Sequence, residues 1–230
     1  MCFSAEASFA GGVIISAIGV ATITKVHKPS QLIFASIPLF FGFQQFAEGL
    51  VWLTIPNPAD AAILKMATYV FLIMADFLWP MMIPLAVLMM EKNEKKKRIL
   101  QVFSIAGLAL SMYYAYCLVF YNIYPEISGY HILYKTDFPK ALSMPAFIIY
   151  LIVTIIPLFI SSIKRTHLLG VLMFLSCLVT AIFFRQYLTS VWCFFAALIS
   201  GVIFWILRDS KRVFKFDRLN LLKAMQIKLP

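Results

Sequence analysis

The sequence predicts an all-α membrane protein, a bundle of seven transmembrane helices. Of its 230 residues, 62% are hydrophobic and only 13% are charged, which is about half the charged fraction of an ordinary soluble domain. Apolar runs repeat along the whole chain, and the mean hydropathy is +0.89. The runs are continuously apolar rather than alternating, which argues against membrane-spanning strands. We therefore interpret residues 1–207 as one transmembrane domain and 208–230 as a basic amphipathic tail.

The predicted spans follow one another with short connections. Most have the roughly 17–25 residues that a helix needs to cross the hydrocarbon core. No basic segment precedes the first run, so we expect it to remain as a helix rather than to be removed as a signal peptide. The third run is longer than one straight crossing and contains Pro80, so a kink or strong tilt is expected near Trp79 and Pro80. The spans are 3–24, 32–55, 61–90, 99–121, 141–163, 168–184 and 188–207.

The distribution of basic residues predicts the orientation. Of the 20 Lys and Arg residues, all but four lie in the connections after the odd-numbered spans or in the tail; the four exceptions are Lys65, Lys135, Lys140 and Arg185. The positive-inside rule then places the N-terminus outside and the C-terminus in the cytoplasm. Orientation explains the net charge of +10 better than a nucleic-acid partner does. The expected partners are membrane lipids, with the tail lying along the anionic inner surface.

Polar side chains in the second span indicate where a site lies. Gln44, Gln45 and Glu48 stand inside an apolar run, and with Trp52 they fall within roughly a 100° arc of one helix face. A charge at this depth is unfavourable and usually faces the bundle interior or a wet cavity. We therefore expect Glu48 to anchor a polar pocket that opens toward the outer face, with Gln44, Gln45 and Trp52 contacting the substrate.

Other groups are expected at a similar depth. Asp76, near the middle of the third span, could form a paired acid/base site with Glu48, which makes these two the catalytic candidates. Trp192 and Cys193 open the seventh span, and Arg185 precedes it. All three are candidates for substrate binding, although Arg185 could instead extend to the interface. The alternative is that these polar groups only hold the helices together.

The outer connection 122–140 is either an aromatic lid over this site or part of an interfacial aromatic belt. Its aromatic side chains are Tyr124, Tyr130, His131 and Tyr134.

The sequence gives little support for a metal site or for a Ser–His catalytic triad. The three histidines lie in different connections, so no HExxH pattern exists, and the four cysteines lack zinc or disulfide spacing. No metal site or cofactor is indicated, and an enzyme would depend on carboxylates, amides or a thiol. Cys2, if Met1 is removed, could act as a metal ligand or nucleophile. The plainer interpretation of Cys2 is a small apolar residue at the membrane surface.

Three motifs carry a family resemblance: MCFSA at the N-terminus, QQxxEGxVW beginning at Gln44, and SVWCFFAA beginning at Ser190. With them the chain resembles an uncharacterised family of small bacterial multi-pass membrane proteins. The resemblance implies a bacterial inner-membrane protein and carries no catalytic role.

Three functions remain open from the sequence. The first is a membrane-embedded enzyme or binding protein for a lipid or small amphiphile, centred on Glu48. The second is a transporter or channel for a small solute or proton, with Glu48 and Asp76 as relay sites. The third is a sensory or scaffold protein without catalysis.

Overall fold

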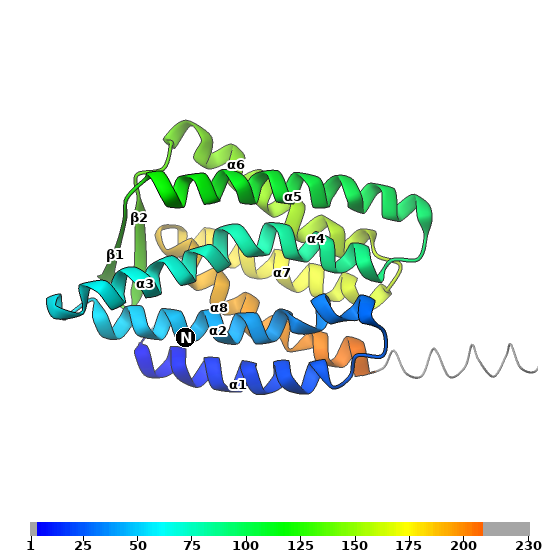
Figure 1. Ribbon diagram of the computed structural model, residues 1–230, viewed down its shortest axis with the longest axis horizontal. Helices are drawn as coiled ribbons and strands as arrows, with labels where there is room; N and C mark the ends of the chain where they lie inside the picture. Colours follow the sequence, from blue (N-terminus) through cyan, green and yellow to red (C-terminus); the bar gives the residue numbers. More distant parts are fainter. Residues whose placement is uncertain (1–3, 209–230) are drawn as a thin grey trace, which may run out of the picture.

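A computed structural model describes residues 4–208, which form a helical bundle with one small hairpin (Figure 1). The helices are α1 Ala5–Ile23, α2 Leu32–Thr54, α3 Ala61–Leu72, α4 Trp79–Met90, α5 Glu94–Phe120, α6 Lys140–Ile160, α7 Lys164–Phe183 and α8 Leu188–Ser200. The strands are β1 Ile123–Ser128 and β2 His131–Thr136. The tail beyond Arg208, with its predicted place on the inner surface, lies outside the described residues.

Six helical segments within residues 4–208 are long and apolar enough to cross a membrane, which is typical of a multi-pass membrane protein. They are Ala5–Ile23, Pro58–Met90, Glu94–Phe120, Lys140–Ile160, Lys164–Phe183 and Arg185–Arg208. The remaining long helix, α2, has 23 residues but is not one of the six, because Gln44, Gln45 and Glu48 lower its mean hydropathy. The helices therefore follow the predicted spans, while the count of seven crossings stays a prediction.

The helices α5 and α7 begin a turn earlier than predicted. They start at Glu94 and Lys164, within charged segments that a search for apolar runs leaves out. At α5 the reason is local, because the Asn93 side chain accepts hydrogen bonds from the backbone N–H groups of Lys95 and Lys96 at 3.0 and 3.2 Å. This cap satisfies N–H groups that have no partner inside the helix.

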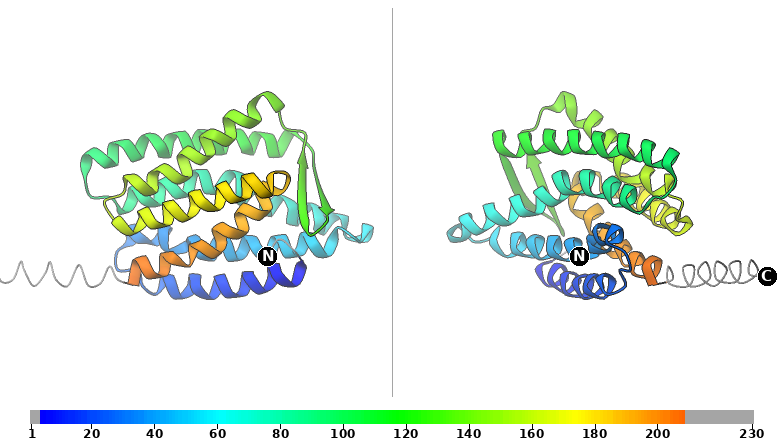
Figure 2. Two further views of the ribbon diagram at one scale, coloured as in Figure 1. Left: turned by 180° about the vertical axis from the view of Figure 1, so that it is seen from behind. Right: turned by 45° about the vertical axis from the view of Figure 1, so that its right-hand side comes forward.

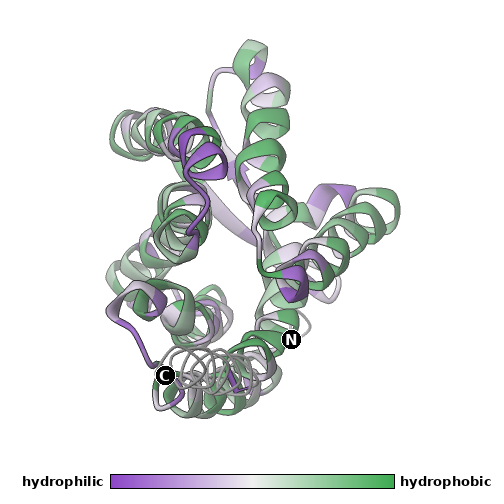
Figure 3. Cartoon of the chain, turned by 90° about the vertical axis from the view of Figure 1, so that its right-hand side faces the viewer, coloured by the Kyte–Doolittle hydropathy of each residue, from purple (hydrophilic) through white to green (hydrophobic). Residues whose placement is uncertain are grey.

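The two ends of the bundle differ in charge. The α1–α2, α4–α5 and α6–α7 connections lie at one end (Figure 1). We call it the basic end because it carries Lys25, Lys28, Lys92, Lys95, Lys96, Lys97, Arg98, Lys164 and Arg165. The opposite end, which holds β1 and β2, is the hairpin end. Viewed from the basic end, the helices are mostly apolar and the hydrophilic segments lie mainly in the connections (Figure 3).

The first two helices pack closely because small residues face each other. A Cβ atom on Gly19 would lie 2.5 Å from the backbone nitrogen of Leu39, and one on Gly12 would lie 3.2 Å from the carbonyl oxygen of Gly42. Helices approach this closely only where side chains are absent or short. The contact fixes α2 against α1 and leaves other faces of α2 for the rest of the bundle.

The third apolar run is interrupted where the sequence predicted a break. A π-helical segment, Ile73–Leu78, separates α3 from α4, and the Trp79 N–H bonds to the Met74 carbonyl. The cause is Pro80, which has no N–H to give to the preceding turn. The axes of α3 and α4 run in different directions (Figure 1), so the predicted break near Trp79 and Pro80 is confirmed.

Neighbouring helices satisfy carbonyls in this segment. The Ser111 hydroxyl donates to the Phe77 carbonyl at 2.6 Å, and the Tyr150 hydroxyl donates to the Ala75 carbonyl at 2.7 Å. Irregular backbone inside a membrane requires such partners. The π segment is thereby attached to both α5 and α6.

The hairpin corrects the all-α prediction. Ile123 pairs with Thr136 and Ser128 with His131 in an antiparallel register, which leaves a two-residue turn. Gly129 in this turn has φ 62°, a conformation that suits glycine and the first position of a tight hairpin turn. The hairpin crosses the end of the bundle from α5 and α6 toward α2 and α3 (Figures 1 and 2). The sequence signal was Gly129 between two β-prone runs.

Candidate functional site

Glu48 lies at the centre of a buried hydrogen-bonded group. Its side chain is 0% exposed. The Ser190 hydroxyl of α8 donates to Oε1 of Glu48, and Nε2 of Gln45 donates to Oε2 at 3.4 Å. The two ion pairs found within residues 4–208 join Lys97 to Glu94 and Lys135 to Glu126, so neither involves Glu48. Both of these hydrogen bonds come from neutral side chains.

Gln44 joins four elements at the same depth. Its carbonyl oxygen accepts a hydrogen bond from Nε1 of Trp79 at 3.0 Å. Its amide nitrogen lies 3.4 Å from the Phe71 carbonyl and 3.4 Å from Sγ of Cys193. Gln44 therefore connects α2 with α3, α4 and α8. We call the set Gln44, Gln45, Glu48, Trp79, Ser190 and Cys193 the polar cluster.

Several buried polar atoms near the cluster have no hydrogen-bond partner within the described chain. They include Oε1 of Gln45, Nε1 of Trp52 and Nε1 of Trp192. Leaving such an atom unsatisfied costs about 1–3 kcal/mol, so native proteins keep few of them. The cluster is therefore not fully paired within the described chain.

Asp76 lies outside the hydrogen bonds of the polar cluster that the described residues show. It is half-buried in the π segment and interacts electrostatically with Tyr114, Tyr150 and Cys193. Cys193 also interacts with Glu48. The thiol is thus within electrostatic range of both predicted carboxylates.

The structure separates the predicted binding residues. Gln44, Gln45 and Cys193 are in the cluster, and Trp192 is buried beside Tyr150, with ring centroids 5.6 Å apart. Trp52 is half-buried and packs with Val51, Ala67 and Ile132 beneath the hairpin.

Arg185 does not supply the expected counter-charge. Its side chain is exposed, and no ion pair joins it to Glu48 within residues 4–208. The short Arg185–Tyr187 turn brings Tyr187, not Arg185, against the hairpin, where its hydroxyl lies 2.8 Å from that of Ser128.

The hairpin covers the cluster, which corrects the prediction of an open outer pocket. The Tyr134 ring stacks on Phe71 with centroids 4.8 Å apart, and the His131 ring contacts Phe184 and Tyr187. Ile132 is fully buried. Of the four aromatic residues predicted as a lid, Tyr124 and Tyr130 instead point to the surface and are 50% and 76% exposed. Because Gln44, Gln45 and Glu48 are all 0% exposed, the site is closed.

Apolar surface adjoins the cluster toward the basic end. Phe41, one turn before Gln44 on α2, stacks on Trp79 with ring centroids 3.9 Å apart. Beyond this pair lies a small cavity whose lining is apolar except for Ser200. The lining residues are Phe34, Ile37, Phe41, Ile83, Leu158, Leu169, Met173, Ala196, Ser200 and Ile203.

Sequence reasoning missed Ser190, Trp79 and Tyr150 as site residues. Ser190 could have been found, because it lies three residues before Cys193 and therefore on the same helix face. Trp79 was noted only for the break at Pro80. Tyr150 carries no signal in the sequence, because its contact with Ala75 depends on how α6 crosses the π segment.

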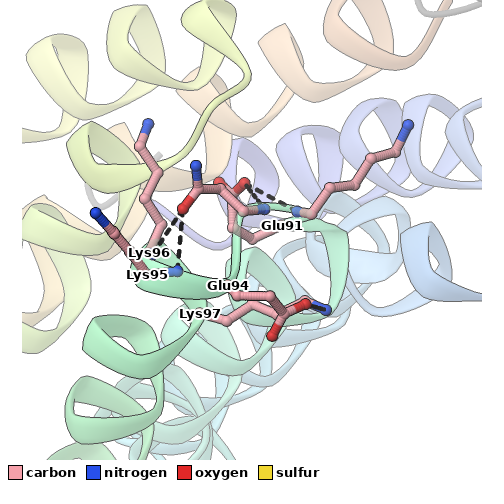
Figure 4. Close-up of polar contacts among 7 residues, drawn as sticks. Glu91, Glu94, Lys95, Lys96 and Lys97 are labelled. Atoms are coloured by element: carbon pink, nitrogen blue, oxygen red, sulfur yellow. Dashed lines mark hydrogen bonds and ion pairs between the residues drawn. The ribbon is translucent and has the colours of Figure 1, made fainter.

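A second buried glutamate, Glu91, was also missed. It is 4% exposed and accepts hydrogen bonds from the backbone N–H groups of Lys92, Asn93 and Ser162 at 2.8, 2.9 and 2.7 Å. Burial acts to raise the pKa of Glu91, but these hydrogen bonds outweigh it and hold the pKa below the ordinary value. Figure 4 shows Glu91 at the α4–α5 connection. Glu91 ties that connection to the one between α6 and α7.

The described residues do not supply a set of side chains that could bind a transition metal. No three side chains of His, Cys, Asp or Glu gather there in a way that could hold a metal ion. Cys2 lies outside the described residues.

The fold and the polar cluster define a helical membrane protein with a closed, carboxylate-containing site. Residues 1–217 match a family of unknown function, DUF6629, and the chain belongs to that family. The resemblance to an uncharacterised family is confirmed at this level. No curated protein and no solved structure matches the chain, so the comparisons bring no activity.

Proposed function

We propose that the protein is a membrane-embedded binding protein or enzyme for a lipid or small amphiphile, whose polar group contacts the cluster around Glu48. The observation that carries the proposal is a fully buried carboxylate in contact with Gln45, whose Oε1 atom has no hydrogen-bond partner within the described chain. Oε1 of Gln45 can accept a hydrogen bond, and Nε1 of Trp192 can donate one. A ligand group that donates a hydrogen bond beside Glu48 satisfies Oε1 of Gln45.

The surroundings support an amphiphilic ligand. Polar groups lie toward the hairpin end, and the apolar Phe41–Trp79 pair follows toward the basic end. The cavity beyond this pair has a volume of about 20 Å³, enough for about one water molecule, so the tail of a ligand has to displace side chains there. Glu48 and Asp76 are the groups for proton transfer, with Cys193 in electrostatic range of both. Gln44, Gln45, Trp192 and Cys193 hold the ligand.

Access to the site requires the hairpin to move. Trp52 lies beneath the hairpin and Arg185 is exposed near it, so their contribution is to the path of the ligand rather than to the closed site. The hairpin docks mainly through ring contacts, with Tyr134 on Phe71 and His131 on Tyr187. Such contacts can separate without breaking helix hydrogen bonds.

We propose that the chain crosses the membrane seven times and that α2, which is less apolar than the other six spans, is one of the crossings. The N-terminus is outside and the C-terminus cytoplasmic, in a bacterial inner membrane. The shared position of the basic connections at one end of the bundle supports this arrangement. A reporter fused after Pro230 should be active only as a cytoplasmic fusion, and Cys2 should react with a membrane-impermeant thiol reagent from outside. A periplasmic C-terminal reporter would overturn the count of seven.

Transport of a small solute or proton is the second candidate. One observation favours it: the π segment places Asp76 at a break in the middle of a span, and π-helical insertions occur frequently at functional sites. Purified chain in proteoliposomes should then acidify or alkalinise the lumen when a proton gradient is applied, and Asp76→Asn should abolish the effect. A binding protein or enzyme shows no such flux.

Native mass spectrometry of the purified full chain tests the main proposal. We expect wild-type protein to retain a small apolar-tailed molecule of defined mass, and Glu48→Gln to lose it while remaining folded. Glu6→Gln is the matched control, because Glu6 is an exposed carboxylate. Identical adducts in all three proteins would contradict the proposal. A change in thermal stability alone, with no ligand lost, would favour a scaffold role.

A further inference from the structure

Ser190 and Glu48 are arranged as a nucleophile and its base. The Ser190 hydroxyl donates a hydrogen bond to Oε1 of Glu48, and both side chains are 0% exposed. The buried hydroxyls of Ser111, Ser176 and Ser200 donate instead to backbone carbonyls, which do not take up a proton. A carboxylate does, and an adjacent base of this kind turns a weakly nucleophilic serine hydroxyl into an attacking group.

Gln45 holds the Glu48 carboxylate in its orientation toward Ser190. Nε2 of Gln45 donates to Oε2 of Glu48 at 3.4 Å, so both carboxylate oxygens accept a hydrogen bond, as those of an ionised glutamate do. Gln45 and Glu48 lie three positions apart on one face of α2. A base that is itself oriented by a third group is the arrangement found in catalytic triads. Ser190, Glu48 and Gln45 repeat this order of nucleophile, base and orienting group.

The start of α8 suits a negative charge that develops at Ser190. The helix begins at Leu188, so Ser190 lies in its first turn. The N-terminus of a helix carries a partial positive charge, which stabilises the oxyanion that forms when a serine attacks a carbonyl group. A further donor is Nε1 of Trp52, which is buried and has no hydrogen-bond partner within the described chain. Trp52 follows Glu48 by one turn on the same face of α2.

The hairpin controls access to Ser190. Tyr187 precedes Ser190 by three residues, and its hydroxyl lies 2.8 Å from that of Ser128 on β1. The Tyr187 ring also packs against His131 of β2. Movement of the hairpin therefore opens space at the first turn of α8, and its return excludes water from the serine.

The surroundings select an ester of an apolar acyl chain as the substrate. An ester carbonyl is uncharged until it is attacked, so it enters the interior without the cost of a second charge beside Glu48. Toward the basic end, the residues that follow Ser190 on α8 include Ala196 and Ser200, which line the small cavity together with Phe41 of α2. An acyl chain attached at Ser190 thus follows apolar surface on α2 and α8 when the side chains of the cavity move apart.

We propose that the protein transfers the acyl group of an apolar ester to water, with Ser190 as nucleophile, Glu48 as general base and Gln45 as a positioning residue. This inference rests on the proposed function, because the ester is an amphiphile bound at the polar cluster.

The reaction has two steps that use the same base. First, Oγ of Ser190 bonds to the ester carbonyl carbon while its proton passes to Glu48. The bond from that carbon to the alcohol oxygen breaks, and Glu48 gives the proton to the departing alcohol. Second, a water oxygen bonds to the acyl carbon and gives a proton to Glu48. The bond to Oγ breaks, the proton returns to Ser190, and the carboxylic acid leaves.

The test is covalent labelling of the purified full chain in detergent with a fluorophosphonate that carries an alkyl chain. The probe reacts with a serine oxygen that an adjacent base activates, forming an O–P bond and releasing fluoride. We expect labelling to saturate at one probe per chain, and peptide mass spectrometry should find the probe on Ser190. No label, or a label on another residue alone, would overturn the proposal. This measurement uses wild-type protein and so does not depend on whether a variant folds.

Variants assign the roles. Ser190→Ala should lose the label, and Glu48→Gln should slow labelling by at least about 100-fold, the smaller effect expected of general-base catalysis. Ser176→Ala is the matched control, because Ser176 is a buried serine that donates to a backbone carbonyl, and it should be labelled at the wild-type rate. Labelling of Glu48→Gln at that rate would overturn the role of Glu48 as the base.

Gln45→Met tests the positioning role while keeping the volume of the side chain. We expect slower labelling and a displaced pH profile of the labelling rate, because the carboxylate loses the hydrogen bond from Nε2 of Gln45. Ser176→Ala should keep the wild-type profile. A slower rate with an unchanged pH profile would mean that Gln45 serves only the packing of α2.

The two measurements can fail separately. Ser190→Ala keeps Glu48 and Gln45, so it should still retain an apolar-tailed molecule in native mass spectrometry although it is not labelled. A wild-type chain that retains such a molecule without labelling at Ser190 would overturn only the acyl transfer. A chain that retains none would instead count against the proposed function.

Discussion

Glu48 and Glu91 are both buried glutamates, but their hydrogen-bond partners differ in kind. Glu91 accepts from three backbone N–H groups in two connections at the basic end. Glu48 is held by the side chains of Ser190 and Gln45 in the interior of the bundle. Backbone donors cannot leave without unfolding the segment that carries them, whereas side-chain donors can rotate away. The difference indicates that Glu91 is structural and that Glu48 can exchange partners.

The surroundings strengthen this distinction. Beside Glu48, Oε1 of Gln45 is buried and has no hydrogen-bond partner within the described chain. All the oxygens of Glu91, in contrast, have partners. A protein that only needed a charge to hold helices together would satisfy it as Glu91 is satisfied.

The largest effect on stability is expected at Glu91. Glu91→Gln should lower the free energy of unfolding by about 3 kcal/mol, because an amide group would face backbone donors that the carboxylate now satisfies. Glu94→Gln is the control, since Glu94 is exposed and pairs only with Lys97, and it should change stability by less than about 0.5 kcal/mol. Chemical denaturation of the two variants in detergent measures both values. Equal losses of stability in the two variants would contradict a structural role for Glu91.

A somewhat smaller loss is expected where α5 meets the first turn of α4. A Cβ atom on Gly107 would lie 2.0 Å from the Pro80 carbonyl oxygen, so Gly107→Ala should push α5 outward and cost about 2 kcal/mol.

Gly11→Ala is the control for Gly107→Ala, because a Cβ there meets nothing within 4 Å. It should be neutral or stabilise α1 by up to about 1 kcal/mol. Chemical denaturation in detergent measures the free energy of unfolding of both variants. If Gly107→Ala were also neutral, the close contact between α5 and Pro80 of α4 would be wrong.

Glu48→Gln should change stability least among the interior substitutions. We expect a difference within about 1 kcal/mol, because the amide keeps the shape of the side chain and the partner groups can rotate. Ligand retention should nevertheless be lost, as measured by native mass spectrometry. A stability loss as large as that of Glu91→Gln would mean that both glutamates serve the fold alone.

The smallest effect concerns pH. The pKa of Glu91 is held below its ordinary value of 4.5 in the folded protein, so its charged form contributes stability above pH 4.5. That contribution should decline as the pH falls below 4.5 and through the folded pKa. The stability difference between wild type and Glu91→Gln should thus be constant near neutral pH and shrink in acid. A difference that grows in acid would contradict the direction of the pKa shift.

The sequence by itself determined the helical spans and their polar contents. Continuous apolar runs located the helices to within about one turn, and Pro80 located the break, because each depends on local chemistry. The expectation that Glu48 turns inward also needed only the physics of a charge in lipid. The hairpin was missed since a short strand pair depends on what it packs against, here Phe71 and Tyr187.

Only the tertiary structure decided which polar groups meet. Ser190 is 142 positions from Glu48 in the chain, and Cys193 is 149 from Gln44, so no local pattern couples them. Arg185 and Asp76 were both expected near Glu48, but the Arg185 side chain is exposed, whereas Asp76 is half-buried and in electrostatic range of Cys193. Depth follows from position along an apolar run. The direction in which a side chain points across the bundle follows from helix packing, which the small residues at Gly12, Gly19 and Gly107 control through close backbone contacts.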